Sequence, residues 1–202
     1  TCSMKIGIYG GSFDPVHVGH VNAALTFKEE LSLDKIIVIP AYQPPHKKGL
    51  AMTPSEHRLN MCNIAFGKLP GFEVSDIEIK REDEGYMADT IAQLREIYPD
   101  DEFYLLMGGD MLLYFRRWYA WHKIAEEAVL AVAARNWEDD SALEAEAAVL
   151  RSYEANVVIV PIDVKEISST SVRETVRRAD DISSMVPEGV DDYIWDHYLY
   201  YN

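Results

Sequence analysis

The sequence predicts an α/β fold, in which a doubly wound, mostly parallel, Rossmann-like sheet carries helices on both faces. Short apolar runs alternate along the chain with segments whose apolar residues recur at helical spacing. Turn-forming Gly or Pro residues follow the first two of these runs. Alternation of this kind favours parallel strands, because the connection between two parallel strands is usually a helix.

The first three elements follow this pattern closely. Residues 5–9 (KIGIY) form an apolar run that stops at two glycines, which is typical of a buried strand followed by a turn. Residues 17–31 repeat apolar residues at helical spacing and are expected to form a helix. Residues 35–39 (KIIVI) predict a second buried strand, which ends at Pro40 because proline cannot donate to a strand ladder.

The next two elements are predicted from a proline and from an alternating pattern. Pro54 suits the first turn of a helix over residues 54–66, whose core face is expected to carry Leu59 and Ile64. Residues 72–80 alternate apolar and charged side chains, which predicts a half-exposed strand.

The second half of the chain repeats the strand and helix alternation. Three further apolar runs predict strands at residues 102–107, 128–134 and 156–160. Helical spacing of apolar residues predicts helices at residues 89–97, 111–125 (short and rich in aromatic residues), 141–153, 169–178 and 190–197. The sequence shows no internal repeat and no Gly/Ser linker. We therefore expect one domain over residues 4–202, with residues 1–3 preceding a natural start at Met4.

Composition and charge exclude several classes of protein. The chain has 202 residues, of which 48% are hydrophobic and 26% charged, as in globular proteins with a buried core. No apolar run approaches the roughly 18 residues of a membrane helix. The net charge of -15 disfavours nucleic acid and anionic membranes as partners. Cys2 and Cys62 are too few for a disulfide framework, so we expect a reduced, cytoplasmic protein.

The turn after the first strand is the first candidate site. Residues 10–20 read GGSFDPVHVGH, and two glycines there would let a ligand approach the backbone closely. The free N–H groups at the start of the following helix would favour a phosphate. The glycines do not form the G-x-G-x-x-G fingerprint of dinucleotide-binding folds, and no Gly-Lys-Ser/Thr follows as in a P-loop. The pattern therefore disfavours hydride transfer.

Two histidines at the start of this helix carry the chemistry. His17 and His20 are three residues apart, so both side chains can point the same way and donate hydrogen bonds to phosphate oxygens. Gly19 is expected to keep a side chain from crowding the ligand. A helix cap with an exposed histidine is the structural alternative, and a zinc site is a weaker one, because neither cysteine is near in sequence.

A second pattern lies far along the chain, at residues 167–173 (ISSTSVR). Its hydroxyl residues are expected to cap a helix, and Arg173 falls in the first turn, where it could reach a polyphosphate. Taken alone, this is a common capping pattern. Together with the histidines, it favours a phosphate-binding role.

These residues resemble a known family. The sequence of residues 11–15 (GSFDP), His17-x-Gly-His20 and the late Ile-Ser-Ser-Thr-x-Val-Arg are similar to the nucleotidyltransferases with HxGH and ISSTxxR signatures, and among them to the bacterial nicotinate-mononucleotide adenylyltransferases. Further matches in the family's order are residues 44–47 (PPHK), Tyr86 with Asp89-Thr90, Gly108-x-Asp110 and Phe115-x-x-Trp118. The resemblance runs from Lys5 to about Tyr200.

The resemblance implies a reaction and a set of site residues. The 5′-phosphate of nicotinate mononucleotide would attack the α-phosphorus of ATP, with Mg²⁺ carried by the ATP phosphates and no metal site built from protein side chains. Residues implied in ATP binding are Gly10, Gly11, Phe13, His17, His20, Gly108, Asp110, Ser169, Thr170 and Arg173, with His17, His20 and Arg173 catalytic. Residues implied in binding the pyridine nucleotide are Lys47, Tyr86, Met87, Thr90, Tyr114, Trp118 and Arg135.

Two departures from the family pattern bear on substrate choice. Met87 stands where the family commonly has a threonine or serine, and Ala41 where it often has an asparagine. Loss of a polar contact can relax discrimination between substrates. The sequence therefore leaves the choice between nicotinate and nicotinamide mononucleotide open, and also whether the chain forms a homo-oligomer.

Three alternatives compete with this interpretation. Pantetheine-phosphate adenylyltransferases share both signatures but are typically shorter and lack the stretches around Tyr86 and Trp118. A fragment of a class I aminoacyl-tRNA synthetase would need a second, lysine-rich loop and an RNA-binding domain. A nucleotide sensor would bind ATP without turnover, but it would not need the two histidines and Arg173 to stabilise charge at phosphorus.

Overall fold

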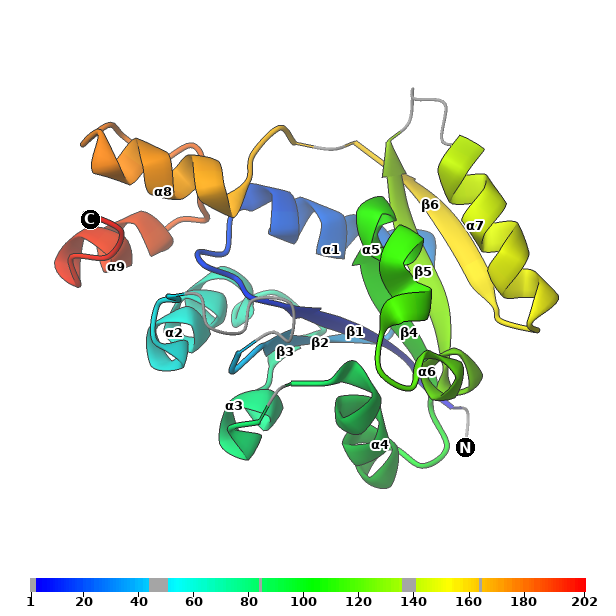
Figure 1. The fold of residues 1–202 in the computed structure, drawn as a ribbon. Coiled ribbons are helices and arrows are strands. Elements are labelled where there is room, and N and C mark those ends of the chain that lie inside the picture. Colours follow the sequence, from blue (N-terminus) through cyan, green and yellow to red (C-terminus); the bar gives the residue numbers. More distant parts are fainter. Residues whose placement is uncertain (1–2, 44–50, 84, 136–140, 164) are drawn as a thin grey trace. The chain divides into compact units, whose positions relative to one another are not determined.

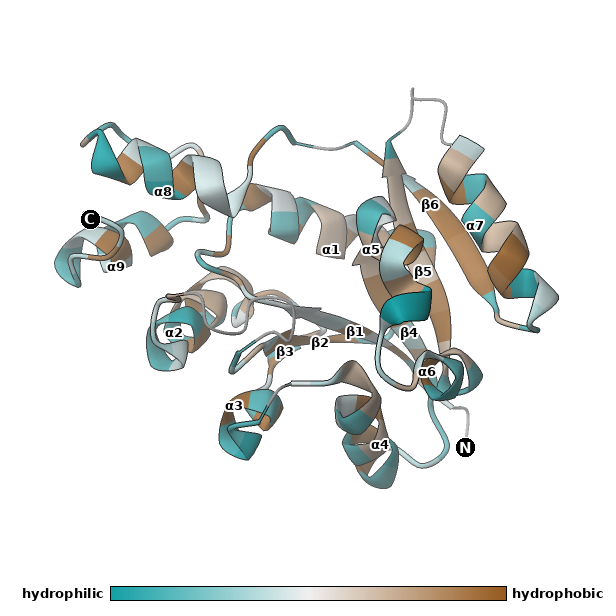
Figure 2. Cartoon of the chain, in the orientation of Figure 1, coloured by the Kyte–Doolittle hydropathy of each residue, from teal (hydrophilic) through white to brown (hydrophobic). Residues whose placement is uncertain are grey.

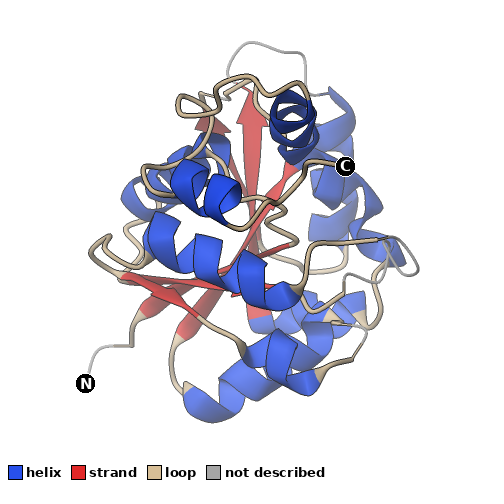
Figure 3. Ribbon diagram, turned by 90° about the vertical axis from the view of Figure 1, so that its left-hand side faces the viewer, coloured by secondary structure: helices blue, strands red, loops and turns tan. Residues whose placement is uncertain are grey.

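A computed structural model describes residues 3–43, 51–83, 85–135, 141–163 and 165–202. Each strand is followed along the chain by one or more helices (Figure 1), and Figure 3 shows the strands in red and the helices in blue. The strands are β1 (Lys5–Gly11), β2 (Lys35–Pro40), β3 (Phe72–Val74), β4 (Glu102–Gly108), β5 (Ala128–Arg135) and β6 (Val157–Ile162). The helices are α1 (Val18–Glu30), α2 (Ser55–Phe66), α3 (Ile77–Arg81), α4 (Met87–Ile97), α5 (Gly109–Tyr114), the 3-10 helix η2 (Phe115–Arg117), α6 (Trp121–Glu127), α7 (Ser141–Ser152), α8 (Ser169–Arg177) and α9 (Val190–Asp196).

The six strands form one sheet in the order β3-β2-β1-β4-β5-β6. The pairs β1–β4, β4–β5 and β5–β6 are parallel, with Leu105 opposite Leu130 and Val132 opposite Ile159. The predicted Rossmann-like α/β fold with a parallel sheet is confirmed. In sheets of this kind, ligands bind at the carboxyl ends of the strands, near the point where the strand order reverses. β1 lies at that point, and its carboxyl end leads into the Gly10-Gly11 turn.

The contacts divide the chain into two compact units. Unit 1 comprises residues 1–9, 23–37 and 86–163, and unit 2 comprises residues 10–22, 38–85 and 164–202. Among the described residues, no helix has both the length and the apolar character needed to cross a membrane. That residues 4–202 form one domain stays a prediction.

The core of unit 1 is built on strands that are apolar almost throughout their length (Figure 2). Strands buried on both faces lose the alternation of apolar and polar residues, so they read as continuous hydrophobic runs. Its buried side chains include those of Phe103, Leu105, Leu106, Leu130, Val132, Leu143 and Leu150. This is why the strands of unit 1 could be predicted from the sequence.

The core of unit 2 is built from helices that come from distant parts of the sequence. α2 supplies Met61, Cys62 and Phe66, and the ring of Phe66 stacks on Phe72 of β3 at 5.6 Å between centroids. α8 and α9 contribute a further apolar set, namely Val172, Val176, Val190 and Ile194. The phosphate-binding signatures predicted from the sequence both lie in this unit.

The predicted strand over residues 72–80 is wrong beyond Val74. The apolar alternation of Phe72 and Val74 ends there, and the main chain turns into helix α3, where the Ile77 N–H donates to Ser75 Oγ at 3.3 Å. The alternation resumes at Ile77 with its register shifted by one residue, which a continuous strand cannot accommodate on one face. This shift is the sequence signal for a break.

The predicted core face of the helix over residues 54–66 is also wrong. α2 begins at Ser55, with Pro54 at its N-cap, and Ile64 is exposed while Leu59 is half-buried. The buried face instead carries Arg58 together with Met61, Cys62, Ala65 and Phe66. The error arose because a charged residue was not expected to occupy a core position.

Candidate active site

The turn between β1 and α1 packs around one aromatic ring. Phe13 has a left-handed backbone (φ 49°) and is buried, with its ring edge-on to the ring of His20 at 5.0 Å. A Cβ at Gly11 would lie 3.2 Å from this ring, which is why a glycine is suited to the position. Phe13 therefore helps to fix the plane of the His20 imidazole, in addition to any contact that it makes with a nucleotide.

The two histidines are held by backbone N–H groups. The rings of His17 and His20 lie 3.7 Å apart at 31° between planes. The Gly19 N–H donates to His17 Nδ1, and the His17 N–H donates to His20 Nδ1, both at 3.0 Å. A nitrogen that accepts a hydrogen bond carries no proton, so in each neutral ring the proton sits on Nε2. Each histidine is thus fixed as an Nε2–H donor.

Burial keeps both imidazoles neutral. Burial lowers the pKa of His17 from 6.5 to about 4. It also lowers the pKa of His20, and repulsion between the positively charged forms of the two rings lowers it further. At neutral pH, the pair therefore offers hydrogen-bond donors to an anion without carrying a charge of its own.

Gly19 leaves room for the His17 ring. A Cβ at this position would lie 2.8 Å from His17 Cε1 and 2.9 Å from Nδ1, closer than real contacts allow. The sequence suggested that a side chain at position 19 would crowd a bound substrate. In the structure, such a side chain would first collide with the His17 ring. Glycine here lets the ring accept the Gly19 N–H.

The second signature begins helix α8 and caps it. Ser168 Oγ accepts the Ser171 N–H, and Ser171 Oγ accepts the Ser168 N–H, both at 3.0 Å, which forms a capping box. The capping role predicted for these hydroxyl groups is confirmed. Ser169 and Thr170 are then held in the first turn of α8.

The two signatures contact each other within unit 2. Ser169 Oγ donates to the Pro15 carbonyl at 2.8 Å, and Arg173 Nη1 donates to the Asp14 carbonyl at 2.7 Å. Arg173 Nη2 also donates to Thr170 Oγ1 at 3.2 Å. Residues that are about 150 positions apart in the sequence are thus brought together beside the histidine pair.

Sequence reasoning missed Arg58, whose side chain supports the turn between β1 and α1 by a hydrogen bond to Ser12. Its side chain is 1% exposed, and its guanidinium donates to the carbonyls of Ser12 (2.9 Å), Ala41 (2.6 Å), Tyr42 (3.0 Å) and Thr53 (2.8 Å). One buried cation therefore holds the main chain of three segments of unit 2. An arginine at helical spacing with Met61, Cys62 and Ala65 was the available sequence signal.

Asp14 and Tyr200 form the other contact that the sequence did not reveal. The Tyr200 hydroxyl donates to Asp14 Oδ1 at 2.5 Å, and the Thr53 N–H donates to Asp14 Oδ2 at 3.3 Å. Both side-chain oxygens of Asp14 are thus engaged. Nothing in the local sequence links residues that are 186 positions apart.

Unit 1 holds the residues predicted to bind the pyridine nucleotide, apart from Lys47, which lies outside the described residues. Tyr86 precedes α4, which begins at Met87, and the ring of Tyr86 meets Tyr119 edge-on at 4.9 Å. Thr90 is buried, and its hydroxyl donates to the Tyr86 carbonyl at 3.4 Å, so it supports the start of this helix. Their contacts with a substrate stay predictions.

The predicted residues that follow β4 lie on short helices. Gly108 ends β4, and a Cβ built on it would have no neighbour within 4 Å, so the backbone is open to approach there. Asp110 is in the first turn of α5, and Tyr114, at its end, is 56% exposed. Trp118 is half-buried, with its ring 5.2 Å from Phe115.

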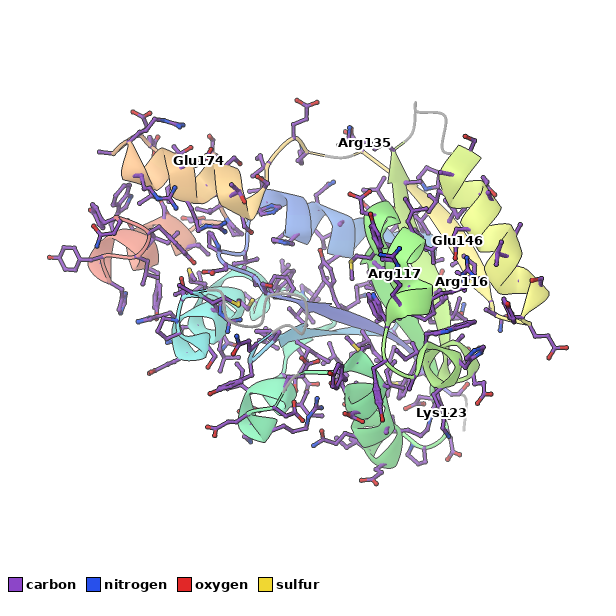
Figure 4. The ribbon with its side chains drawn as sticks, in the orientation of Figure 1. Arg116, Arg117, Lys123, Arg135, Glu146 and Glu174 are labelled. Carbon is purple, nitrogen blue, oxygen red and sulfur yellow. The ribbon has the colours of Figure 1, made fainter. Side chains whose placement is uncertain are left out.

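Unit 1 also carries basic side chains, two of which, Arg116 and Arg117, belong to this segment. Arg116 forms two contacts with Glu146 of α7, at 2.6 and 3.2 Å (Figure 4). Arg117 lies over the ring of Tyr114, with 5.2 Å to the centroid. Arg135, which ends β5, is exposed. In the part of the chain that the structure describes, no three His, Cys, Asp or Glu side chains are grouped so that they could hold a metal ion.

The fold and these residues agree with the comparisons to known proteins. The model of the family described as cytidylyltransferase-like matches residues 8–175, so the chain belongs to this class of nucleotidyltransferases. A relative in Shewanella pealeana, named "Probable nicotinate-nucleotide adenylyltransferase", is 37% identical over 208 residues, which cover 98% of this chain and 96% of the relative. A relative of the same name in Dictyoglomus thermophilum is 39% identical over 197 residues, which cover 98% of this chain and 100% of the relative. The chain belongs to the nicotinate-nucleotide adenylyltransferase family.

A solved structure shares the fold. It is the nicotinic acid mononucleotide adenylyltransferase of Plasmodium falciparum in complex with NaAD, which is similar to this chain with a TM-score of 0.76 over 98% of both chains. At 21% sequence identity, this likeness bears on the fold alone.

Proposed function

We propose that this protein transfers the adenylyl group of ATP to nicotinate mononucleotide in the cytoplasm, as a step of NAD synthesis. An oxygen of the mononucleotide 5′-phosphate attacks the α-phosphorus of ATP. The bond from that phosphorus to the oxygen bridging to the β-phosphorus breaks, and pyrophosphate leaves with the electron pair. Nicotinate adenine dinucleotide forms without a covalent enzyme intermediate. The observation that carries the proposal is the contact of Arg173 and Ser169 with Asp14 and Pro15, beside the histidines.

His17 and His20 act in this proposal as neutral donors to phosphate. Their Nε2–H groups are fixed by the backbone contacts at Nδ1. Hydrogen bonds to the reacting phosphate strengthen as negative charge builds on it in the transition state. No general base is required, because the attacking phosphate is already ionised and phosphoryl chemistry depends mainly on positioning and charge stabilisation.

Arg173, with Ser169 and Thr170, receives the β- and γ-phosphates in this proposal. A guanidinium has five N–H donors, and the contacts with Asp14 and Thr170 use two of them. The charge of Arg173 favours departure of pyrophosphate, because it stabilises the anion that leaves. The neighbouring histidines add donors without charge, so Arg173 is the cation of this group of five residues.

Magnesium would reach the site on the nucleotide. Mg²⁺ takes oxygen ligands in near-octahedral geometry. In unit 2, the candidate residues instead present N–H and O–H donors, and both carboxylate oxygens of Asp14 already accept hydrogen bonds. These residues of unit 2 therefore offer no free carboxylate oxygen to Mg²⁺, and we derive no step through the ion.

The pyridine nucleotide is assigned to the aromatic segment of unit 1. Trp118 stacks on the nicotinate ring in this proposal, since an indole and an electron-poor ring attract each other. The other residues assigned to the pyridine nucleotide are Tyr86, Met87, Thr90, Tyr114, Arg135 and Lys47. The preference for nicotinate over nicotinamide is left to measurement, because Met87 offers only its backbone N–H where the family commonly has a hydroxyl.

Turnover with three acceptors tests the proposal directly. Purified protein is incubated with Mg-ATP and either nicotinate mononucleotide, nicotinamide mononucleotide or phosphopantetheine, and dinucleotide and pyrophosphate are followed by chromatography. We expect strong turnover of the nicotinate form. Comparable turnover of both mononucleotides would identify a dual-specificity enzyme, and Met87 and Ala41 would be the first residues to test as its cause. Binding of ATP without turnover of any acceptor would contradict the proposal and support the nucleotide sensor.

A variant of His20 tests the mechanism. Removing one donor aimed at developing charge lowers a rate by roughly a hundred- to a thousand-fold, so we expect that loss in kcat for His20→Ala. His197→Ala is the control, because His197 is an exposed histidine of the same unit. A loss under about tenfold in a folded His20→Ala protein would exclude the proposed role.

A further inference from the structure

Asp14 links Arg173, the predicted catalytic arginine, to Tyr200. Its backbone carbonyl accepts Arg173 Nη1 at 2.7 Å, while its carboxylate accepts the Tyr200 hydroxyl and the Thr53 N–H. Asp14 is 8% exposed, so water gives its carboxylate little support. A buried carboxylate depends on protein donors, and losing one is costly. The orientation of Asp14, and with it the carbonyl that Arg173 contacts, depends on Tyr200.

The chain adopts an uncommon backbone to make this contact. Tyr198 and Tyr200 both have left-handed φ angles, of 51° and 68°, which residues other than glycine rarely adopt. Leu199 between them is buried, and its N–H donates to the Ile194 carbonyl at 3.0 Å. Such conformations persist where surrounding contacts hold them, and they concentrate at functional sites. Here they turn the Tyr200 ring inward, to Asp14.

The neighbouring tyrosines show that Tyr200 is placed differently from the rest of this segment. Tyr198 is 78% exposed and Tyr201 is 44% exposed. The Tyr200 hydroxyl instead lies against Asp14, where burial and the carboxylate both raise its pKa. Tyr200 therefore remains a hydroxyl donor at neutral pH.

We propose that Tyr200 is a positioning residue for adenylyl transfer, acting through Asp14 on Arg173. This inference rests on the role proposed above for Arg173. The Tyr200 hydroxyl donates to Asp14 Oδ1 and so holds the Asp14 residue in place. The Asp14 carbonyl can then accept Nη1 of the Arg173 guanidinium and fix its position. Without the hydroxyl, the carboxylate must turn to find another donor, and the carbonyl and Arg173 shift with it.

Tyr200→Phe removes only the hydroxyl, and Tyr198→Phe and Tyr201→Phe are its matched controls. A misplacement of about 1 Å at a reacting group can cost roughly a hundred-fold in rate, so a partial shift of Arg173 is expected to lower kcat by about tenfold. The KM for nicotinate mononucleotide should stay unchanged, and both control variants should keep the wild-type kcat. A Tyr200→Phe kcat equal to that of the controls would overturn the inference.

A double-mutant cycle separates positioning from a purely structural role. If Tyr200 acts through Arg173, then Tyr200→Phe should lower kcat much less in an Arg173→Lys background than in the wild type, because residues that act as a unit are not additive. Equal fold-losses in both backgrounds would show that Tyr200 does not act through Arg173 and would overturn the inference. A wild-type kcat for Arg173→Lys alone would instead contradict the role proposed for Arg173.

Asp14→Ala tests the same contact from its other partner, should Tyr200→Phe fail to fold. It removes the oxygens that accept the Tyr200 hydroxyl and the Thr53 N–H, but keeps the backbone carbonyl that Arg173 contacts. We expect kcat to fall with the KM for nicotinate mononucleotide unchanged, and the thermal midpoint of each variant to confirm that it is folded. A folded Asp14→Ala protein with wild-type kcat would overturn the inference.

Discussion

Lowering the pH from about 7.5 to about 5 should destabilise the protein through His17. An imidazole in the unfolded chain takes up a proton near its usual pKa of 6.5, whereas burial lowers the pKa of the folded His17 to about 4. As the pH falls below 6.5, the unfolded chain therefore binds the proton first, and the free energy of unfolding decreases. The loss continues until the pH reaches the folded pKa.

The magnitude follows from the two pKa values. One pKa unit corresponds to about 1.4 kcal/mol, so the gap between 6.5 and about 4 amounts to about 3 kcal/mol when fully developed. About 2 kcal/mol of this should be lost by pH 5, because the folded ring is still mostly neutral there. With a urea dependence of about 2 kcal/mol per molar, the midpoint should fall by about 1 M.

Urea unfolding of the wild type and of His17→Gln, followed by circular dichroism between about pH 7.5 and pH 5, measures this loss. Glutamine keeps an N–H donor but does not titrate, so the variant should lose about 2 kcal/mol less than the wild type over this range. Carboxylates contribute equally to both proteins and cancel in the difference. Identical pH dependence of the wild type and His17→Gln would refute the assignment of a buried, neutral His17.

Three further substitutions have definite outcomes. Gly19→Ala should lower kcat by about a hundred-fold with little change in thermal midpoint, because its Cβ would displace the His17 ring; steady-state kinetics within threefold of the wild type would contradict this. Arg58→Met should reduce the free energy of unfolding by about 3 to 5 kcal/mol in urea unfolding, since four backbone carbonyls lose their donor, and a loss below about 1 kcal/mol would contradict it. Arg116→Ala should lower the thermal midpoint by no more than about 2 °C, because the Arg116 side chain is 43% exposed and solvent screens its charge, although the Glu146 side chain is only 13% exposed; a drop of several degrees would show otherwise.

The strands were predictable because burial leaves a direct trace in the sequence. Five of the six strands are apolar runs, and each was placed within one or two residues of its observed bounds. The exception, residues 72–80, looked like one strand because Ile77 and Ile79 continue the alternation after a shift of one residue. A helix of five residues, α3, is too short to show a helical period of its own.

The site was predictable only where its residues are close in sequence. His17 and His20, and Ser169 with Arg173, form short motifs whose spacing indicates phosphate binding. Arg58 was missed because it is a charged residue on the apolar face of a helix. Tyr200 was missed because its contact with Asp14 depends on how the chain folds, and a tyrosine among other tyrosines carries no local signal.

The origin of unit 2 from three separate segments has a consequence for how the protein folds. Asp14 must meet Arg173, 159 positions away, and Tyr200, 186 positions away. Contacts between distant positions form slowly, because chain entropy must be lost before they contribute any stabilisation. During refolding, helical content should therefore recover before activity does. We expect the contacts of Asp14 with Arg173 and Tyr200 to be among the last in the molecule to form, and chains that lack them to be inactive.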